Sequence, residues 1–309
     1  MKTISVREYA DRYFDRVEGL GESASVLETE PSDICLPRRK PVTHKYSYGR
    51  ALIVSGARGY SGAPVLAANA AERSGAGLTH LMVPESIYIP AAVGCDGAVV
   101  TPLPANARGQ LAAAALPEIL PQLERASACA VGPGLGPGED TKVLTDSIVR
   151  HSVCPLLLDA DALTACGNSP ELLDACCGPL VLTPHEGEFR RLGGDLSEGR
   201  LVGALRFTRE HPGVILILKG YGTLVCRGGE AVVNPTGCPA MAKGGAGDVL
   251  SGILCALLAQ GFEAWSAALY AVWLHGLAGD LAAQEQGEYS LTPSDLIRFL
   301  PRAFRTAQK

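Results

Sequence analysis

The sequence predicts an α/β fold, a three-layer α/β/α sandwich around a central, mostly parallel sheet. Short apolar runs of strand length alternate along the chain with segments of helical length and composition, which is typical of a sheet covered by helices on both faces. The runs are apolar at almost every position rather than at every second one, and this favours strands that are buried on both sides. The predicted strands are 51–55, 78–83, 128–131, 155–159, 180–183 and 214–218.

The remaining elements follow from the pattern around these runs. Residues 5–17 have a helical pattern, and the charge-mixed, proline-bearing segment from Gly19 to about Thr43 is predicted to be a loop or arm. Two further apolar runs, 223–226 and 230–233, flank an RGG turn and predict a hairpin. Helices are predicted at 63–74, 109–123, 139–151, 197–210, 246–260, 263–284 and 293–304. We therefore expect an N-terminal helix and arm, residues 1–43, and one α/β domain, residues 44–309.

Composition and charge exclude several classes of protein. The chain has 309 residues, of which 47% are hydrophobic and 19% are charged, so it can bury a sizeable core and lies far from the disordered regime. The net charge is −5 and the longest basic run is Arg38-Arg39-Lys40, which argues against a nucleic acid or a membrane as partner. The ten cysteines form no CxxC pair, and the first twenty residues lack the apolar segment of a secretory signal. We expect a cytoplasmic protein.

Glycine-rich and polar segments stand where the predicted strands end. Ligands of open parallel sheets bind outside the carboxyl ends of the strands, which all lie at one edge. The segments that follow the strands are 56–63, 132–136, 159–161, 183–188 and 219–223. The sequence therefore predicts that these five segments converge on a single ligand-binding rim.

The segment Lys243-Gly244-Gly245-Ala246-Gly247-Asp248 runs directly into an apolar helix. Glycines at a helix start let several backbone N–H groups point into one space, and the helix dipole adds positive potential there, so this segment predicts an anion-binding site. Asp248 would place a carboxylate beside the anion, where it could accept a proton from a hydroxyl that attacks phosphorus. An ordinary capping aspartate after a glycine loop is the alternative.

Other residues of the rim leave two interpretations open. Asp159 and Asp161 could hold Mg²⁺, or one of them could cap the following turn. His185 lacks a second imidazole nearby in the sequence, so a hydrogen-bonding role is favoured over metal ligation. Lys219 ends a strongly apolar strand and predicts contact with a phosphate or carboxylate, with a structural ion pair as the alternative. His275 lies on an apolar helix and is expected to be a core histidine with its hydrogen bonds satisfied.

Two common nucleotide motifs are absent from the sequence. GARGYSG at 56–62 is GxxGxxG rather than the GxGxxG dinucleotide fingerprint, and no acidic residue ends the next predicted strand. The pattern GxxxxGK[ST] of the P-loop does not occur. A Rossmann cofactor site and a P-loop nucleotide site are therefore both poor interpretations.

Six blocks in order resemble the nucleotide-dependent NAD(P)H-hydrate dehydratases of the ribokinase-like superfamily. They are GYSGAPVLAANAAERSGAGLTHLMVP, AVGPGLG, LLLDADAL, LTPHEGEF, LKGYGTLV and NPTGCPAMAKGGAGDVLSGILCALLAQG, and the resemblance covers about residues 44–300. It implies a ribokinase-like sandwich and a repair lyase that removes water from the S form of NADH or NADPH hydrate. The ring hydroxyl is phosphorylated at the expense of a nucleoside phosphate, and phosphate is then eliminated. The large epimerase domain fused to some relatives is not expected here.

The resemblance also implies roles for individual residues. Asp248 would be the base, and the amides of Gly245, Ala246 and Gly247 would stabilise the transferring phosphoryl group. Substrate-binding positions match Ala63, Gly134, Gly136, His185 and Asp248, and nucleotide-binding positions match Lys219, Gly220, Tyr221, Gly222, Thr223 and Gly247. Glu188 falls where sugar-kinase relatives carry a glutamate tied to Mg²⁺. Relatives often form homo-oligomers, tetramers among them.

The sequence departs from the family pattern at two positions and leaves two competing functions open. Ala246 replaces the usual threonine or methionine of the loop and should cause little loss, whereas Tyr46 replaces a glycine of the entry loop. ADP is favoured over ATP as the phosphoryl donor because the PTGxP block has a bacterial form. The alternatives are a kinase of a hydroxymethylpyrimidine- or thiazole-type alcohol and an inactive nucleotide-binding regulator.

Overall fold

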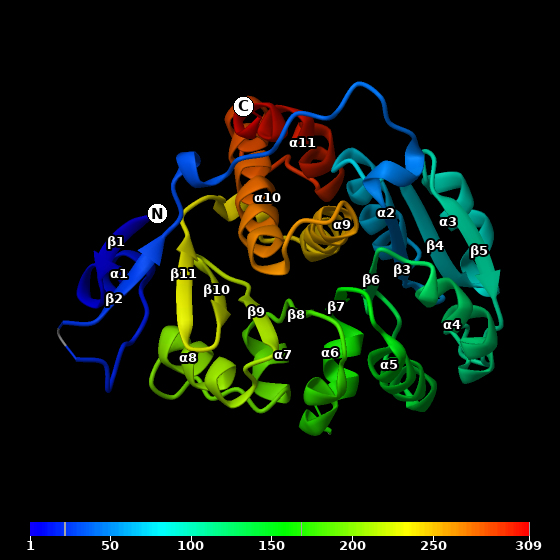
Figure 1. Cartoon of the computed structure of the whole chain (residues 1–309), viewed down its shortest axis with the longest axis horizontal. Helices are drawn as coiled ribbons and strands as arrows, with labels where there is room; N and C mark the ends of the chain where they lie inside the picture. Colours follow the sequence, from blue (N-terminus) through cyan, green and yellow to red (C-terminus); the bar gives the residue numbers. More distant parts are fainter. Residues whose placement is uncertain (22, 168, 309) are drawn as a thin grey trace.

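One sheet runs through the molecule and carries helices on both faces (Figure 1). The computed structural model describes residues 1–21, 23–167 and 169–308. Its strand order is β1-β2-β11-β10-β9-β8-β7-β6-β3-β4-β5. The strands are β1 Lys2–Ser5, β2 Ser25–Glu28, β3 Arg50–Val54, β4 Leu78–Pro84, β5 Val99–Leu103, β6 Ala128–Val131, β7 Leu156–Leu158, β8 Leu180–Leu182, β9 Val214–Leu218, β10 Thr223–Arg227 and β11 Glu230–Asn234. The central part from β9 to β5 is parallel throughout, whereas β10 pairs antiparallel with both β9 and β11.

The helices form two layers. They are α1 Val6–Tyr13, α2 Gly62–Arg73, α3 Tyr88–Gly94, α4 Leu116–Glu124, α5 Glu139–His151, α6 Asp161–Cys166, α7 Glu186–Arg191, α8 Arg200–Glu210, α9 Ala246–Ala259, α10 Ala264–Gln286 and α11 Pro293–Ala307. Helices α2, α9, α10 and α11 cover one face, and α4 to α8 cover the other (Figure 1). The predicted ribokinase-like α/β/α sandwich is confirmed.

The sheet buries both of its faces because successive side chains of a strand point to opposite sides. In β3, Ala51 and Ile53 belong to the core under α9, whereas Leu52 and Val54 belong to the core on the other side. All four are fully buried. The uninterrupted apolar runs of the sequence are therefore the physical consequence of two cores that share one sheet.

Several elements were absent from the sequence-based expectation. Strands β1, β2 and β5 lie toward the sheet edges and expose part of their side chains, so they carry no continuous apolar run. The helix expected at 109–123 begins only at Leu116, because the segment before it turns at Gly109 and pairs with 57 and 105 through isolated bridges. The short helices α3, α6 and α7 were also not predicted.

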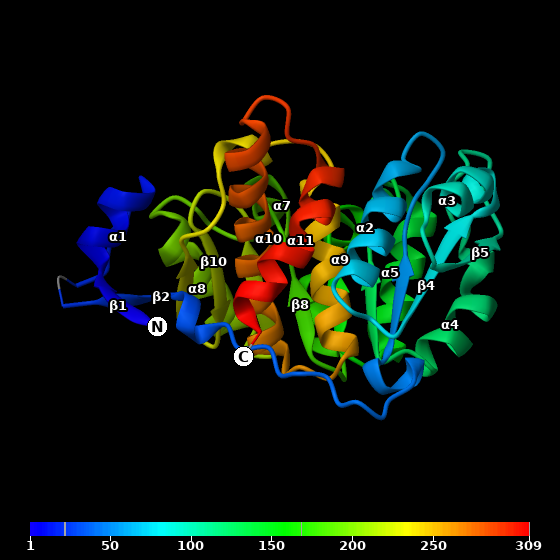
Figure 2. The same cartoon turned by 90° about the horizontal axis from the view of Figure 1, so that it is seen from above.

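The segment expected to be a loop or arm contributes to the sheet. Strand β2 runs parallel to β11 and antiparallel to β1, which adds two strands beyond the hairpin. Further along, Leu36 N–H donates to the carbonyl of Ala307, so the segment also follows the last helix (Figure 2). The division of the chain at residue 43 stays a prediction.

Candidate functional site

Helix α9 begins at the glycine loop. Gly245 is its N-cap and has a φ of 98°. A Cβ built on Gly245 would lie 2.8 Å from the Leu66 side chain and 2.9 Å from that of Pro293, so both backbone conformation and space require glycine. The first N–H groups of a helix have no partner within it. The loop therefore lies at the positive end of a 14-residue helix, where the N–H of Ala246 donates to the carbonyl of Lys243 at 3.3 Å. Anion binding by the loop stays a prediction.

Asp248 stands in the first turn of α9. Burial raises the pKa of its carboxyl to about 7, and the negative charge of Asp159 acts in the same direction, whereas the ammonium of Lys219 opposes it. A carboxyl with a pKa near neutrality exists in both forms at physiological pH, and that is the property required of a general base. The raised pKa of Asp248 is thus compatible with the predicted role of a proton acceptor.

Lys219 connects three parts of the rim. Its Nζ lies 2.8 Å from Oδ1 of Asp159 and 3.7 Å from Oε2 of Glu188. Burial by itself would lower the pKa of Lys219, but the two carboxylates raise it, so the side chain is an ammonium. A Cβ on Gly247 would lie 3.4 Å from the same Nζ, which places the ammonium beside the start of α9. The ion pair left open as the alternative for Lys219 is present.

Asp159 has both carboxylate oxygens engaged. Oδ1 accepts from Lys219, and Oδ2 accepts a 2.7 Å hydrogen bond from the hydroxyl of Ser251 on α9. Asp159 therefore fixes β7, β9 and α9 relative to one another. Asp161 instead accepts a 2.8 Å hydrogen bond from the N–H of Gly136, which fixes the 132–136 turn, and burial raises its pKa.

His185 and Glu188 form a reciprocal cap at the start of α7. His185 Nδ1 accepts from the N–H groups of Gly187 and Glu188, and Oε2 of Glu188 accepts a 2.8 Å hydrogen bond from the N–H of His185. The hydrogen-bonding role predicted for His185 is confirmed. The backbone of His185 also forms an isolated parallel β-bridge with that of Lys219, so the cap belongs to the same rim.

Three predicted substrate positions lie on the turns beside this cluster. Gly134 packs against Ala63, since a Cβ on Gly134 would lie 3.1 Å from the Cβ of Ala63. Gly136 is tied to the cluster through Asp161. These backbone turns follow β3 and β6, which are adjacent strands. The structure thus brings the predicted substrate-binding segments to neighbouring positions on the rim.

The predicted nucleotide run divides into two parts. Lys219 turns inward to the carboxylates, whereas Tyr221 is 62% exposed and its ring centroid lies 5.6 Å from that of Tyr13 and 6.3 Å from that of Phe14. Between them, the N–H of Gly220 donates to the hydroxyl of Thr223, and that hydroxyl donates to the carbonyl of Gly220. Gly222 packs on the ring of Tyr13. The 219–223 turn is therefore ordered by its own hydrogen bonds, and it lies between the acidic cluster and the N-terminal helix.

Sequence reasoning missed several supporting residues. Ser251 was signalled only by being a hydroxyl in an otherwise apolar helix. Arg200 donates to the carbonyls of Tyr221 and Leu218, and it carried no signal that linked it to that turn. Asp15 caps α8 from 185 residues away, which no local pattern can show.

The expectation for His275 was wrong in one respect. The ring is in the protein interior and burial lowers its pKa to about 4, so the imidazole is neutral. Its Nε2, however, is buried and has no hydrogen-bond partner among the described residues. The residue is a core histidine whose polar atoms are not all satisfied.

The acidic residues do not form a metal cage. Across the parts of the chain that the structure describes, no three histidine, cysteine, aspartate or glutamate side chains converge as a metal site. Asp159 is committed to Lys219 and Ser251, and one oxygen of Glu188 is committed to the backbone of His185. Mg²⁺ in phosphoryl-transfer sites takes one or two carboxylates and completes its shell with substrate phosphates and water. The other oxygen of Glu188, Oε1, lies 3.4 Å from Nε2 of His185, and a single carboxylate oxygen of this kind fits that sparse arrangement.

The fold and this rim define a ribokinase-like protein with a glycine loop at a helix start and a buried carboxyl beside it. The family model for NAD(P)H-hydrate dehydratase matches residues 51–302. The chain is 39% identical over 279 residues to the bifunctional NAD(P)H-hydrate repair enzyme of Moorella thermoacetica, an alignment that covers 89% of this chain and 52% of the relative. It spans about half the length of the curated relatives it matches.

Two solved structures support the same relationship. The ADP/ATP-dependent NAD(P)H-hydrate dehydratase of Bacillus subtilis, co-crystallised with ATP and Mg²⁺, superimposes with a TM-score of 0.77 at 29% identity, covering 91% of this chain and 98% of that one. A ribokinase-like protein of Enterococcus faecalis gives a TM-score of 0.80 at 26% identity over 92% of this chain and 97% of that one. This chain belongs to the NAD(P)H-hydrate dehydratase family.

Proposed function

We propose that the protein dehydrates the S form of NADH or NADPH hydrate at the expense of a nucleoside phosphate. The observation that carries the proposal is Asp248, a carboxyl with a pKa of about 7 in the first turn of α9, next to the glycine loop at the start of that helix. Family membership supplies the substrate class. The small-molecule substrates would meet at the rim formed by the carboxyl ends of the strands.

The arrangement supports a definite division of labour. Hydroxide is a poor leaving group, so the ring hydroxyl must first become a phosphate ester. Asp248 would take the hydroxyl proton as the oxygen attacks phosphorus, and the amides of Gly245, Ala246 and Gly247 would hold the phosphoryl oxygens. Phosphate then leaves as the ring nitrogen donates its electron pair, and the resulting iminium loses a proton from the neighbouring ring carbon to solvent, which restores the reduced nicotinamide.

The remaining predicted residues would bind and orient the two substrates. Ala63, Gly134, Gly136 and His185 would contact the hydrate. Lys219 and the turn from Gly220 to Thr223 would contact the nucleotide, whose phosphates would meet the ammonium of Lys219.

Glu188 would hold Mg²⁺ together with the phosphates. When bound, the ion would neutralise part of the phosphate charge. The B. subtilis relative was crystallised with ATP and Mg²⁺. For this chain we propose ADP as the donor, on the basis of the PTGCP block at 235–239.

The location and the oligomeric state of the enzyme are part of the same proposal. Within the described residues, no helix is long and apolar enough to cross a bilayer. We propose a cytoplasmic homo-oligomer, which is what the sequence and its resemblance to the family imply.

A turnover assay tests the proposal. Hydrated NADH or NADPH is supplied with Mg²⁺ and either ADP or ATP, and recovery of reduced-nicotinamide absorbance is followed. The proposal predicts recovery with release of one phosphate per nicotinamide, faster with ADP. Formation of a stable phosphorylated thiazole or pyrimidine alcohol without such recovery would establish the kinase alternative. Nucleotide binding without turnover of either substrate would establish the regulator.

A further inference from the structure

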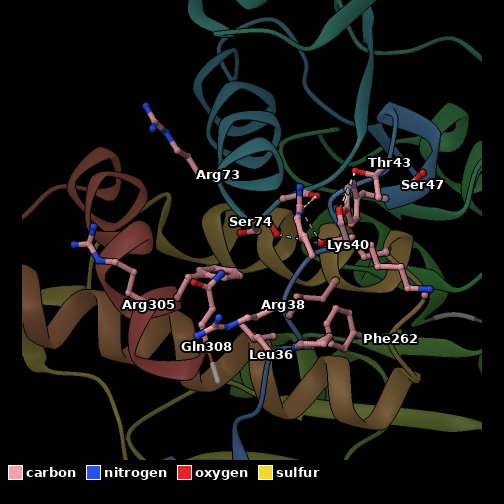
Figure 3. A pocket seen from close by; sticks show the side chains of 18 of the residues that line it. Leu36, Arg38, Lys40, Thr43, Ser47, Arg73, Ser74, Phe262, Arg305 and Gln308 are labelled. Atoms are coloured by element: carbon pink, nitrogen blue, oxygen red, sulfur yellow. Dashed lines mark hydrogen bonds between the residues drawn. The ribbon is translucent and has the colours of Figure 1, made fainter.

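A cavity lies at the opposite end of the sheet from the rim. It has a volume of about 870 Å³ and is enclosed by the 36–48 segment, the last turns of α2 and α9, and α11 (Figure 3). Its wall includes Gln260, which follows α9 at the end away from Asp248. Twelve residues of helix place the two roughly 18 Å apart. The cavity is therefore separate from the candidate active site, and its size suits a small-molecule ligand.

The charged side chains around this cavity are all basic. Among the described residues that line it there is no aspartate or glutamate, whereas five arginines and lysines contribute to it. They come from three separate parts of the chain: Arg38, Arg39 and Lys40 from the N-terminal segment, Arg73 from α2 and Arg305 from α11 (Figure 3). In a protein with a net charge of −5, a cavity with only positive charges focuses an attractive potential for anions.

Part of this basic charge serves the fold. Arg39 donates to the carbonyl of Gly75 and to the side chain of Gln260, and its guanidinium stacks 3.8 Å from the centre of the Tyr48 ring. Arg39 therefore closes the end of α2 and holds the wall in place. Its charge complements the carbonyl end of that helix.

Three of the other cations, Arg73, Lys40 and Arg305, are not needed for such contacts. The nearest carboxylate to Arg73 is that of Asp96, at 3.9 Å and with both side chains more than half exposed, so the pair contributes little. Neither Lys40 nor Arg305 forms an ion pair with any carboxylate in the described part of the chain. These side chains are long enough to turn toward an anion in the cavity. Lys40 and Arg305 therefore bring positive charge to the cavity without a carboxylate partner among the described residues.

The wall between the charges is apolar and partly aromatic. Leu36, Leu257, Phe262 and Phe304 contribute to it. The segment that carries Leu36 is fixed to the end of the chain. The N–H of Leu36 donates to the carbonyl of Ala307 at 2.9 Å, and Leu36 forms an isolated parallel bridge with Gln308. An apolar wall with cations at its margin matches a ligand that has an apolar or aromatic body and a phosphate group.

We propose that this cavity is a second, noncatalytic binding site for a phosphorylated small molecule of nucleotide size. The proposal does not depend on the reaction at the rim. ADP and inorganic pyrophosphate serve as probes, because the first carries both features and the second carries the phosphates alone.

Hydrogen exchange with the whole protein locates the binding. With ADP, we expect protection in two separate regions, the catalytic peptides around 243–250 and the cavity peptides 34–48 and 301–308. Protection of the cavity peptides by pyrophosphate as well would show that phosphate recognition is sufficient. Protection by ADP alone would show that the apolar wall is also required. Exchange at the cavity that neither probe changes would overturn the proposal.

A double variant, Arg73→Ala with Arg305→Ala, tests the residues. We expect at least a tenfold weaker affinity at the cavity, so that calorimetry counts one ADP per chain instead of two, while protection at 243–250 persists and shows that the protein is folded. Lys142→Ala with Arg150→Ala is the matched control, since it removes two cations from exposed positions on α5. It should leave both sites intact.

Two results would contradict this assignment. If the control pair loses ADP binding at the cavity to the same extent, the binding depends on the net charge of the protein and not on Arg73 and Arg305. A wild-type oligomer that dissociates in the cavity variant, with no second ADP in either protein, would show that another copy of the chain covers this surface.

Discussion

Asp248 is the residue on which the chemistry depends. Its pKa is raised to about 7 by burial and then by the charge of Asp159. As a base it must be ionised, so kcat/KM of the dehydration should increase about tenfold per pH unit below 7 and level off above that value. Initial rates between pH 5.5 and 8.5 check this, at low hydrate concentration so that the free enzyme is reported. A rate that is flat across this range would contradict the assignment.

The same raised pKa predicts a change in stability. The folded protein binds the Asp248 proton more tightly than the unfolded chain does, so this carboxyl favours folding less as pH rises from about 4 to about 7. Asparagine does not titrate, so its contribution to the unfolding free energy does not change with pH. The Asp248→Asn variant should therefore gain unfolding free energy over wild type on going from pH 5 to pH 8, on the order of 2 kcal/mol. Urea unfolding at both pH values measures it. A difference that does not change with pH would show that the carboxyl is solvated.

At the scale of elements, the start of α9 has to combine open amides with a tight turn. Gly245→Ala would place a Cβ against Leu66 and Pro293 in a left-handed conformation, so we expect a loss of about 1–3 kcal/mol of unfolding free energy. Gly244→Ala is the matched control for stability, because its Cβ would meet no atom within 4 Å. Denaturant unfolding of both variants compares them. Equal losses would mean that the loop is flexible enough to place the Cβ elsewhere.

The predictability of elements followed their burial. Strands β3, β6 and β9 are buried on both faces, and their apolar runs located them to within a residue or so. Strands β1, β2 and β5 expose part of their side chains and gave no such signal. Helix α5 was located from its pattern at both ends. Helices α6 and α7 have six residues each, too few to show a helical period, so a window of helical length cannot find them.

The site was predictable to the same degree. Glycine and polar residues at strand ends located the rim, because the carboxyl ends of parallel strands share one edge. The pairing inside the rim was not predictable. Lys219 and Asp159 are 60 residues apart, and Ser251 and Asp159 are 92 residues apart. Which side chain engages which depends on the order of strands in the sheet, and local sequence does not specify that order.

At the scale of the whole molecule, the N-terminal segment is joined to the domain at several points. The carboxylate of Asp15 accepts from the N–H groups of Arg200 and Leu201 at the start of α8, at 2.8 and 3.0 Å, and from the buried hydroxyl of Tyr9 at 2.9 Å. This contact adjoins the turn that carries Tyr221, since Arg200 also donates to the Tyr221 carbonyl. The N-terminal segment therefore supports the 219–223 turn, which is proposed to hold the nucleotide.

Removing that contact should weaken the molecule and the nucleotide site together. Asp15→Ala leaves two helix N–H groups and one buried hydroxyl without their acceptor, so we expect a loss of about 2 kcal/mol of unfolding free energy and a higher KM for the nucleotide. Asp11→Ala, at an exposed position on α1 just before Asp15, is the control. Thermal unfolding and nucleotide titration check both. If the two variants behave alike, the segment is not coupled to α8.

The most direct test of the central claim separates binding from chemistry at Asp248. The account predicts that Asp248→Asn loses at least a thousandfold in turnover of hydrated NADH, since the base is removed, while nucleotide affinity changes by less than a few fold because the amides of the glycine loop remain. Turnover and equilibrium binding are measured on the same preparation. Near-normal turnover by this variant, with nucleotide still bound, would contradict the claim that this carboxylate deprotonates the acceptor hydroxyl.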